Sequence, residues 1–347
     1  MTAPVSPARA AGPLRVGVDI GGSKVAVLVV AADGAVLARR SVPAASSEPD
    51  EAIVQITGVI RDAVAEAGAT MADVEAVGLG VPGRVDTASG DVTFAVNLGW
   101  QHLPLGRRLA TSLGVPCVVE NDVRAAAVGL HRDVRFRGPD DLVYLGIGTG
   151  ISAGVVLDGR LHRGVRGLAG EIGHVVLDPD GSACACGLRG CFETIAGGAG
   201  IARAARSAID AGEATSLVGG DGSGADRAPD GPSAADVFAA AETGDPLARR
   251  LVDTAAAAIA RMVHELVLAY DVELVVIGGG ISRAGAPLLD RIRAGLERIA
   301  APSAFAAELL SETDVRLAGP DHDIGTRGAI ALLDPVAKEV VAREAVS

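Results

Sequence analysis

The sequence lacks any apolar run long enough to cross a lipid bilayer without interruption. Its first residues, MTAPVSPARAAGP, also lack the hydrophobic centre of a secretory signal. These two absences predict a protein without a membrane partner, and residues 1–13 are expected to be disordered. At 347 residues the chain is long enough to bury a large core, and its length favours two domains or lobes.

Positive charge and aromatic residues are also scarce. The chain has 31 Lys and Arg residues against 43 Asp and Glu residues, a formal net charge of −12, and its aromatic content is 2%. Proteins that bind nucleic acids neutralise phosphates with clustered basic side chains, and no basic stripe is present. The composition therefore argues against a nucleic-acid partner. The acidic excess also has a simpler interpretation, which is solubility.

Cysteine is rare, yet three of the four cysteines lie close together in the sequence. Cys184, Cys186 and Cys191 follow His174 in the pattern H-x9-C-x-C-x4-C. One imidazole and three thiols are enough for a closed tetrahedral zinc site, which has no open position for a catalytic water. The alternative is a disulfide and a free thiol near a structural histidine. Reduced cysteines in this spacing favour a structural Zn²⁺ that holds residues 174–191, and a cytoplasmic location.

Two carboxylates flank the cysteine cluster. Glu171 lies three residues before His174, and Glu193 lies two residues after Cys191. A polar ligand held next to the cluster would meet both carboxylates. The predicted metal therefore shapes a binding loop and takes no part in the chemistry.

A pattern of strand, glycine turn, strand, hairpin turn and strand occurs twice. The strands are expected at residues 14–20, 24–30 and 35–40, and again at 142–146, 151–157 and 160–163. The glycine turns are Gly21-Gly22-Ser23 and Gly148-Thr149-Gly150. The repeat indicates two similarly built lobes. Glycine turns let backbone N–H groups approach phosphate oxygens, although either turn alone is also an ordinary hairpin signal.

Two further strands run into polar turns. Residues 74–81 lead into Pro82-Gly83-Arg84, and residues 115–119 lead into Glu120-Asn121-Asp122 before an expected helix at 123–130. Open α/β sheets bind ligands where a strand ends next to the start of a helix. Asp122 is therefore a candidate functional carboxylate, or else the N-cap of that helix.

The rest of the chain is predicted to be mainly helical. Helices are expected at residues 49–68, 196–211, 233–270 in two segments, from about 286, and 325–333. Residues 271–277 should form a strand that ends at Gly278-Gly279-Gly280. Residues 212–232 are rich in Gly, Ser, Asp and Ala, which predicts an exposed, disordered insertion.

The motifs A-G-E-I-G-H at 169–174 and C-x-C-G-x-x-G-C-x-E at 184–193 resemble the signature of the ROK family (repressor, open reading frame, kinase). Supporting motifs extend from about residue 16 to about residue 332. The resemblance implies an α/β, two-lobed, actin-like ATPase (ribonuclease H-like) fold with an interlobe cleft. Residues 14–121 with about 318–336 would form the small lobe and residues 122–317 the large lobe. The family's habit also implies a homodimer or homotetramer.

The resemblance implies roles for individual residues. Asp122 would be the catalytic base, with no need for a strongly raised pKa, because the proton moves late in phosphoryl transfer. One ring nitrogen of His174 would bind zinc and the other the sugar. The sugar-binding residues would be Gly83, Asn121, Asp122, Glu171, His174 and Glu193. The residues that bind ATP with Mg²⁺ would be Asp19, Gly21, Gly22, Ser23, Lys24, Gly148, Thr149, Gly150, Gly278, Gly279 and Gly280.

Two classes of function fit this resemblance. The first is an ATP-dependent hexose kinase of carbohydrate metabolism, with glucose as the preferred candidate and N-acetylglucosamine, N-acetylmannosamine, fructose or allose as alternatives. The second is a sugar-sensing transcriptional regulator. Regulators of this family carry a winged helix-turn-helix before the D-I-G-G motif, and only eighteen residues precede Asp19. That short stretch favours the kinase. Polyphosphate stays open as an alternative donor.

Overall fold

The computed structural model describes residues 12–133, 139–217, 231–319 and 323–334. The two segments predicted to be disordered, residues 1–13 and 212–232, lie mostly outside the described residues. The beginning of the second segment is held in place. The Thr215 hydroxyl and the Ser216 backbone N–H both donate to the buried carboxylate of Asp245.

The first sheet has five strands in the order β3-β2-β1-β4-β8. β1 pairs antiparallel with β2, and β2 with β3, whereas β4 lies parallel to both β1 and β8. Buried valines and isoleucines fill the strands on the core side, and the glycine turn after β1 makes the first hairpin possible. The strands are β1 (Leu14–Ile20), β2 (Lys24–Val30), β3 (Val36–Pro43), β4 (Val74–Val81) and β8 (Cys117–Asn121).

The second five-stranded sheet repeats this order as β11-β10-β9-β12-β13. Here β10 pairs antiparallel with β11, and β12 lies parallel to both β9 and β13. The shared strand order confirms the internal repeat predicted from the two glycine turns. The strands are β9 (Leu142–Ile147), β10 (Ile151–Leu157), β11 (Arg160–His162), β12 (Leu274–Gly278) and β13 (Asp314–Leu317).

Helices begin where the sequence supplies proline and acidic residues. Pro49 is in the first turn of α1 with Asp50 and Glu51, and Asp245 caps α7 ahead of Pro246. The α-helices are α1 (Pro49–Glu66), α2 (Leu105–Leu113), α3 (Asp122–Arg132), α4 (Phe192–Ala196), α5 (Gly198–Asp210), α6 (Ala234–Glu242), α7 (Pro246–Tyr270), α8 (Ala286–Ala300), α9 (Ala304–Ser311) and α10 (Ile324–Ala331). The 3₁₀ turns in the described part of the chain are η1 (Met71–Asp73), η2 (Val96–Leu98), η3 (Ile172–His174) and η4 (Gly280–Ala284).

A small antiparallel sheet follows β4, and the sequence analysis did not predict it. Its strands are β5 (Arg84–Asp86), β6 (Asp91–Ala95) and β7 (Trp100–Leu103). Trp100 is fully buried in the adjoining core, and its indole N–H donates to the carbonyl of Ser46. The strands are too short for their alternation to stand out in the sequence.

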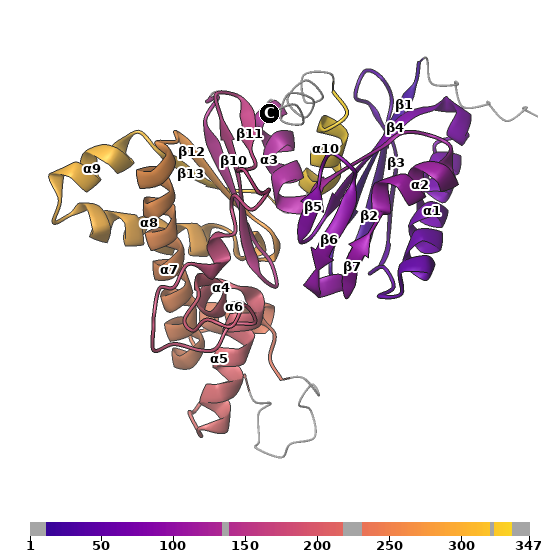
Figure 1. Cartoon of the computed structure of the whole chain (residues 1–347). Helices are drawn as coiled ribbons and strands as arrows, with labels where there is room; N and C mark the ends of the chain where they lie inside the picture. Colours follow the sequence, from indigo (N-terminus) through magenta and orange to yellow (C-terminus); the bar gives the residue numbers. More distant parts are fainter. Residues whose placement is uncertain (1–11, 134–138, 218–230, 320–322, 335–347) are drawn as a thin grey trace, which may run out of the picture. The chain divides into compact units, whose positions relative to one another are not determined.

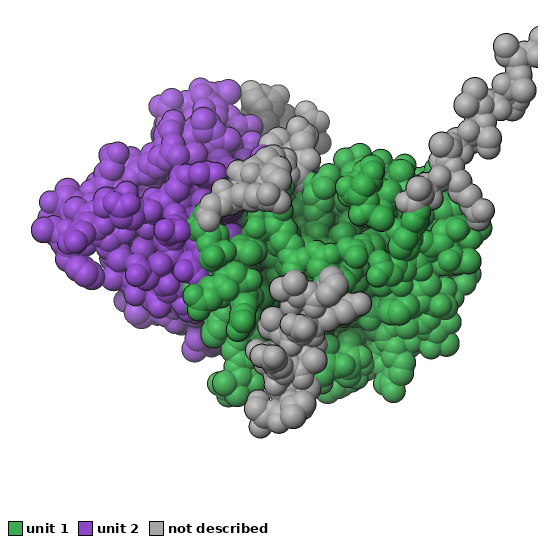
Figure 2. Space-filling model, turned by 90° about the horizontal axis from the view of Figure 1, so that it is seen from above, with its two compact units in different colours: residues 1–140, 154–169, 323–347 green, residues 141–153, 170–322 purple. Residues whose placement is uncertain are grey.

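The chain divides into two compact units, coloured separately in Figure 2. Unit 1 comprises residues 1–140, 154–169 and 323–347, and unit 2 comprises residues 141–153 and 170–322. α3 groups with unit 1 because it packs against α10, whereas the sequence analysis assigned residues from 122 onwards to the second lobe. Figure 1 shows the elements of each unit. Among the described residues, no helix is both long and apolar enough to span a membrane.

Candidate active site

Asn121, the last residue of β8, determines how the turn into α3 is built. Its Oδ1 accepts hydrogen bonds from the backbone N–H groups of Val123 and Arg124, each at 3.1 Å. Asn121 is therefore the N-cap of α3, and this excludes the capping role that the sequence left open for Asp122. The Nδ2 of Asn121 donates to the carbonyl oxygen of Gly83 at 3.1 Å, which ties this turn to the turn after β4.

Asp122 is the first residue of α3, and because Asn121 is the N-cap, the Asp122 carboxylate is not needed to cap the helix. Its Oδ1 accepts one hydrogen bond, from the N–H of Val123 at 2.9 Å. Burial raises its pKa to about 7, the negative charge of Asp19 adds to the rise, and the Val123 N–H opposes it. A strongly raised pKa was not expected from the sequence, since a base that takes its proton late in phosphoryl transfer does not need one. A base with a pKa near neutrality is well matched to accepting a proton.

Asp19, at the carboxyl end of β1, lies near Asp122 in unit 1, since its charge contributes to the raised pKa of Asp122. Burial raises its pKa, and the ammonium group of Lys24 lowers it. The first turn of α10 lies directly over this side chain, because a Cβ at Gly325 would overlap the Asp19 carboxylate. The positive end of a helix and a nearby Lys stabilise the ionised form of an acid. Two half-buried carboxylates next to each other fit a site that receives a divalent cation.

Gly83 is a glycine for two structural reasons. Its φ is +94°, and a Cβ there would overlap the carbonyl of Phe94. Its own carbonyl already accepts from Asn121. Unit 1 thus brings together four predicted site residues, Asp19, Gly83, Asn121 and Asp122.

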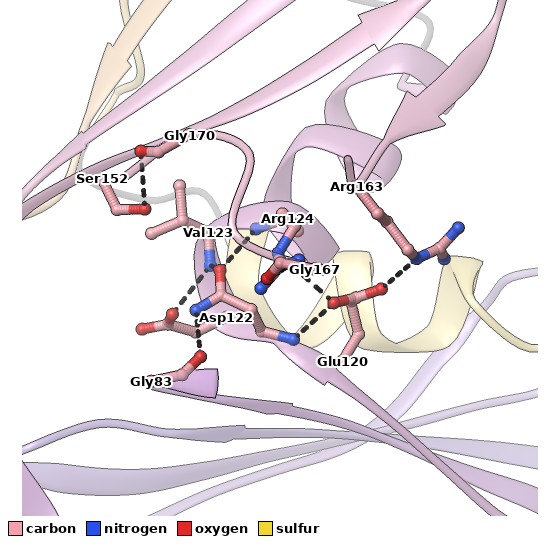
Figure 3. Close-up of polar contacts among 10 residues, drawn as sticks. Gly83, Glu120, Asp122, Val123, Arg124, Ser152, Arg163, Gly167 and Gly170 are labelled. Atoms are coloured by element: carbon pink, nitrogen blue, oxygen red, sulfur yellow. Dashed lines mark hydrogen bonds and ion pairs between the residues drawn. The ribbon is translucent and has the colours of Figure 1, made fainter. Parts of the chain in front are cut away.

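Three buried charged side chains surround the turn that carries Asp122, and no motif in the sequence marked them as a group. Glu120 accepts from the Nε of Arg163 at 2.7 Å and lies 3.5 Å from the Nε of Arg124, as Figure 3 shows. All three side chains are buried. Glu120 and Arg163 are 43 positions apart in the sequence, so no local pattern could have revealed this ion pair.

In unit 2 the three cysteines and the histidine of the predicted metal site converge. The Sγ atoms of Cys184, Cys186 and Cys191 and a ring nitrogen of His174 all lie within 4.8 Å of one another. The ligand atoms of a tetrahedral zinc–thiolate site are about 3.8 Å apart, from a Zn–S distance of about 2.3 Å. The donor set and its span therefore fit a metal site. His174 turns its Nδ1 towards this cluster, 3.6 Å from the Cys184 Sγ.

Glu193, in the first turn of α4, lies next to this His–Cys cluster and next to a glycine turn. Its Oε1 accepts from the Cys184 Sγ at 3.1 Å, and its Oε2 lies 3.0 Å from the position of a Cβ on Gly150. Glu171, the residue before η3, is half-buried and accepts the N–H of His174 with its backbone oxygen. The flanking carboxylates thus have different neighbours, because only Glu193 has a side-chain contact with the cluster.

The start of α5 holds the turn from Gly148 to Gly150 through backbone hydrogen bonds. The N–H of Gly198 donates to the Gly148 carbonyl at 2.8 Å, and the Ala199 N–H donates to the Thr149 carbonyl at 3.3 Å. A Cβ on Gly148 would meet no atom within 4 Å. The turn therefore has an open side at Gly148, where a ligand can approach the backbone.

The three glycines after β12 differ from one another in their surroundings. A Cβ on Gly278 would overlap the ring of Tyr144, and one on Gly279 would overlap the carbonyl of Ile147. Close packing therefore requires glycine at positions 278 and 279, and Gly279 also has a φ of +79°. Only Gly280 has open space at its Cα. Of the three predicted nucleotide contacts, Gly280 is therefore the one whose glycine is not explained by packing.

Comparison with known proteins adds the following. The ROK family matches residues 15–335. A glucokinase of Halalkalibacterium halodurans is 32% identical over 90% of this chain and 92% of its own length, and an N-acetylmannosamine kinase of Escherichia coli is 33% identical over 91% and 96%. Among solved structures, a ROK family glucokinase from Streptomyces griseus in complex with glucose and AMPPNP is 34% identical, with a TM-score of 0.76 over 92% of this chain and 98% of that chain.

Proposed function

The chain belongs to the ROK family and is an ATP-dependent sugar kinase, and from this premise we propose that it phosphorylates glucose to glucose 6-phosphate. Relatives named glucokinase are 32–36% identical to it and the N-acetylmannosamine kinases are 33% identical, so sequence identity alone does not choose between the sugars. The glucokinase solved with glucose favours glucose.

The observation that carries this proposal is the position of Asp122. Its carboxylate stands at the start of a helix, is released from capping by Asn121, and has a pKa raised to about 7. In phosphoryl transfer the protein must orient the attacking hydroxyl and accept its proton. In the proposed mechanism Asp122 holds the attacking sugar hydroxyl and takes its proton as the new P–O bond forms.

The nucleotide is assigned to the glycine turns and Asp19. Gly21, Gly22, Ser23 and Lys24 follow β1, and Gly148, Thr149 and Gly150 follow β9; both turns offer backbone N–H groups to phosphate oxygens. Asp19 would hold Mg²⁺ through water, and the ion would neutralise charge on the phosphates. Gly280 would take the adenosine part, with Gly278 and Gly279 shaping the turn beneath it.

The remaining sugar hydroxyls are assigned to polar groups next to the metal cluster and to the turn after β4. Glu171, Glu193 and the Nε2 of His174 would accept or donate to them, with Asn121 and the backbone of Gly83. Zn²⁺ bound to Nδ1 of His174 would fix the tautomer and direction of the imidazole. A cytoplasmic location and a homodimeric or homotetrameric state remain predictions.

A coupled assay tests this proposal directly. The purified protein is given MgATP with glucose, N-acetylglucosamine, N-acetylmannosamine, fructose and allose in parallel, and kcat/KM is compared. We expect glucose to have the highest value by at least tenfold, because a buried polar contact at one ring position can discriminate that strongly. A higher kcat/KM for N-acetylmannosamine would replace glucose as the substrate. Polyphosphate in place of ATP tests the donor.

A further inference from the structure

Buried charge is concentrated around one turn of this protein. Among the described residues, four charged side chains are buried: Glu120, Arg124, Arg163 and Asp245. The first three surround the β8–α3 turn, which carries Asp122. Burying charge is costly, and a buried ion pair is often no more stabilising than apolar residues of the same volume. Stability alone therefore gives little reason for three charges here.

The three side chains form one connected group. Glu120 is 1% exposed and accepts from Arg163 at 2.7 Å and from the N–H of Asn121 at 2.8 Å, with Arg124 at 3.5 Å. Arg124 in turn donates from Nη1 to the carbonyl of Gly167 at 2.9 Å. Its Nη2 is buried and has no hydrogen-bond partner. One carboxylate thus serves two guanidinium groups, and removing it would leave two buried cations facing each other.

This group fixes the backbone on both sides of Asp122. Glu120 holds the N–H of Asn121, whose side chain caps α3, and Arg124 lies two residues after Asp122 on the first turn of α3. Figure 3 shows the Asp122 carboxylate extending away from Glu120, so the ion pairs brace the turn from the side opposite to the carboxylate. The side chain of Asp122 is held by a hydrogen bond from the adjacent Val123 N–H, which belongs to the same turn. Its direction therefore depends on the turn that carries it.

We propose that Glu120, clamped by Arg163 and Arg124, is a positioning residue that sets the orientation of the catalytic base Asp122. The proposal rests on the proposed kinase function. Arg163 also begins the segment that leads to Glu171, and Arg124 holds that segment at Gly167. The same three charges thus anchor the turn of the base and the approach to a proposed sugar carboxylate.

The test uses Glu120→Gln, which keeps the shape and the acceptor for Asn121 but removes the charge. Misplacing a catalytic group by about 1 Å can cost about a hundredfold in rate. We expect kcat for glucose to fall about ten- to a hundredfold, with the KM for ATP changed less than about threefold. Arg163→Met should have a similar effect, and Arg163→Lys should recover part of the loss, because it restores the positive charge. The double variant should lose no more than the worse single variant.

A second background separates positioning from a general loss of folded protein. In Asp122→Asn enzyme there is no base to orient, so adding Glu120→Gln should lower the residual rate less than about threefold. Glu265→Gln is the matched control, because it breaks an exposed Arg–Glu pair with the same i,i+4 spacing as Glu120 and Arg124. It should leave kcat unchanged.

Two results would overturn the inference: Glu120→Gln with wild-type kcat, or an equal loss in the wild-type and Asp122→Asn backgrounds. If Glu120→Gln does not fold, the comparison of Arg163→Met with Arg163→Lys decides the matter, and equal kcat for the two overturns it. Failure of the wild-type protein to phosphorylate any sugar is a different result, since it refutes the proposed function.

Discussion

At the scale of single residues, the raised pKa of Asp122 predicts a pH dependence. Only the ionised carboxylate can accept a proton, and burial together with Asp19 brings its pKa to about 7. With sugar and MgATP both well below their KM values, so that the rate reports the free enzyme, the rate should therefore fall about tenfold for each pH unit below about 7. An ordinary aspartate would place this limb about three units lower. A profile flat from pH 8 to pH 5 would refute the shift, and the residual rate of Asp122→Asn should show no such limb.

Asp122→Asn tests the base itself. Removing a general base costs about 10²–10⁴-fold in rate, so kcat should fall by that amount, while glucose affinity measured by calorimetry changes little. Retention of more than about a tenth of the wild-type kcat would contradict the assignment.

The same variant makes a prediction about stability. The folded-state pKa of Asp122 lies above its unfolded value of 3.8, so the ionised side chain destabilises the fold at pH values above about 7. That cost disappears as the pH falls from 7 towards 4. Asp122→Asn should accordingly melt roughly 2–4 °C higher than wild type at pH 8, and the difference should shrink at pH 5.

Sequence reasoning found the carboxylate but not its supports. Asp122 was identified because it follows a buried strand and precedes a helix, and because Asn121-Asp122 resembles a family motif. Nothing in the sequence indicates that Glu120 and Arg163 are buried, since their burial depends on the pairing of distant segments. The choice between Asn121 and Asp122 as the N-cap depends on backbone angles that the sequence does not specify, since both residue types are good caps.

At the scale of elements, the turn between β9 and β10 offers a test of nucleotide binding. A side chain at Gly148 would enter space that is open in this structure, whereas one at Gly150 would meet the Glu193 carboxylate. Gly148→Val should thus raise the KM for ATP at least tenfold and leave glucose affinity within about threefold. Gly150→Val should weaken both. An unchanged ATP KM in Gly148→Val would mean that the turn is only a hairpin.

The cysteine loop before α4 offers a second test. If the cluster holds Zn²⁺, the purified protein should contain about one zinc per chain by elemental analysis, and Cys186→Ser should lose it, because a hydroxyl is a poorer ligand than a thiolate. The loop carries Glu193 and His174, so glucose affinity should fall about ten- to a hundredfold. ATP affinity should fall less. Absence of metal from the wild type, or normal glucose affinity in a metal-free variant, would contradict this prediction.

The elements themselves were predicted with differing success. The helix expected at residues 196–211 is α5 (Gly198–Asp210), whereas the short α4 (Phe192–Ala196) just before it was not expected. Gly197 is extended and separates the two helices, and the Gly198 N–H donates to the turn at Gly148, a tertiary contact that the local sequence does not show. Strands β1, β2 and β4 were located within a residue because each is a short, mainly apolar, valine-rich segment that ends near a turn signal.

At the scale of the whole molecule, α10 closes the core of unit 1 through glycines. It packs against β1, β4 and α3, and at several of these contacts a side chain would overlap a backbone carbonyl. Gly328→Ala should destabilise the protein by about 2–4 kcal/mol, because a methyl group there would overlap the Ala125 carbonyl. Chemical denaturation measures this loss. Gly58→Ala in α1 is the control: its methyl would meet no atom within 4 Å, and it should stabilise by about 1 kcal/mol.

The repeated sheet order could be predicted because each copy carries its own glycine turn and hairpin signals. The packing of α3 against α10 could not be predicted, since it depends on the close contact of Gly129 with Gly328. Those glycines are unremarkable in an alanine-rich sequence. The lobe boundaries given in the sequence analysis remain predictions.

The place of α10 in the chain has a consequence for how the protein is made. Unit 1 begins with the first strand but needs α10, and the ribosome must translate residues 141–322 before that helix emerges. Unit 2 is therefore complete in sequence while β1 and β4 still lack the helix that covers them. Such an uncovered apolar surface is where chaperones bind and where aggregation starts. The folding of newly made chains should thus depend on the rate of translation and on the supply of chaperones, and more strongly than the stability of the folded enzyme alone suggests.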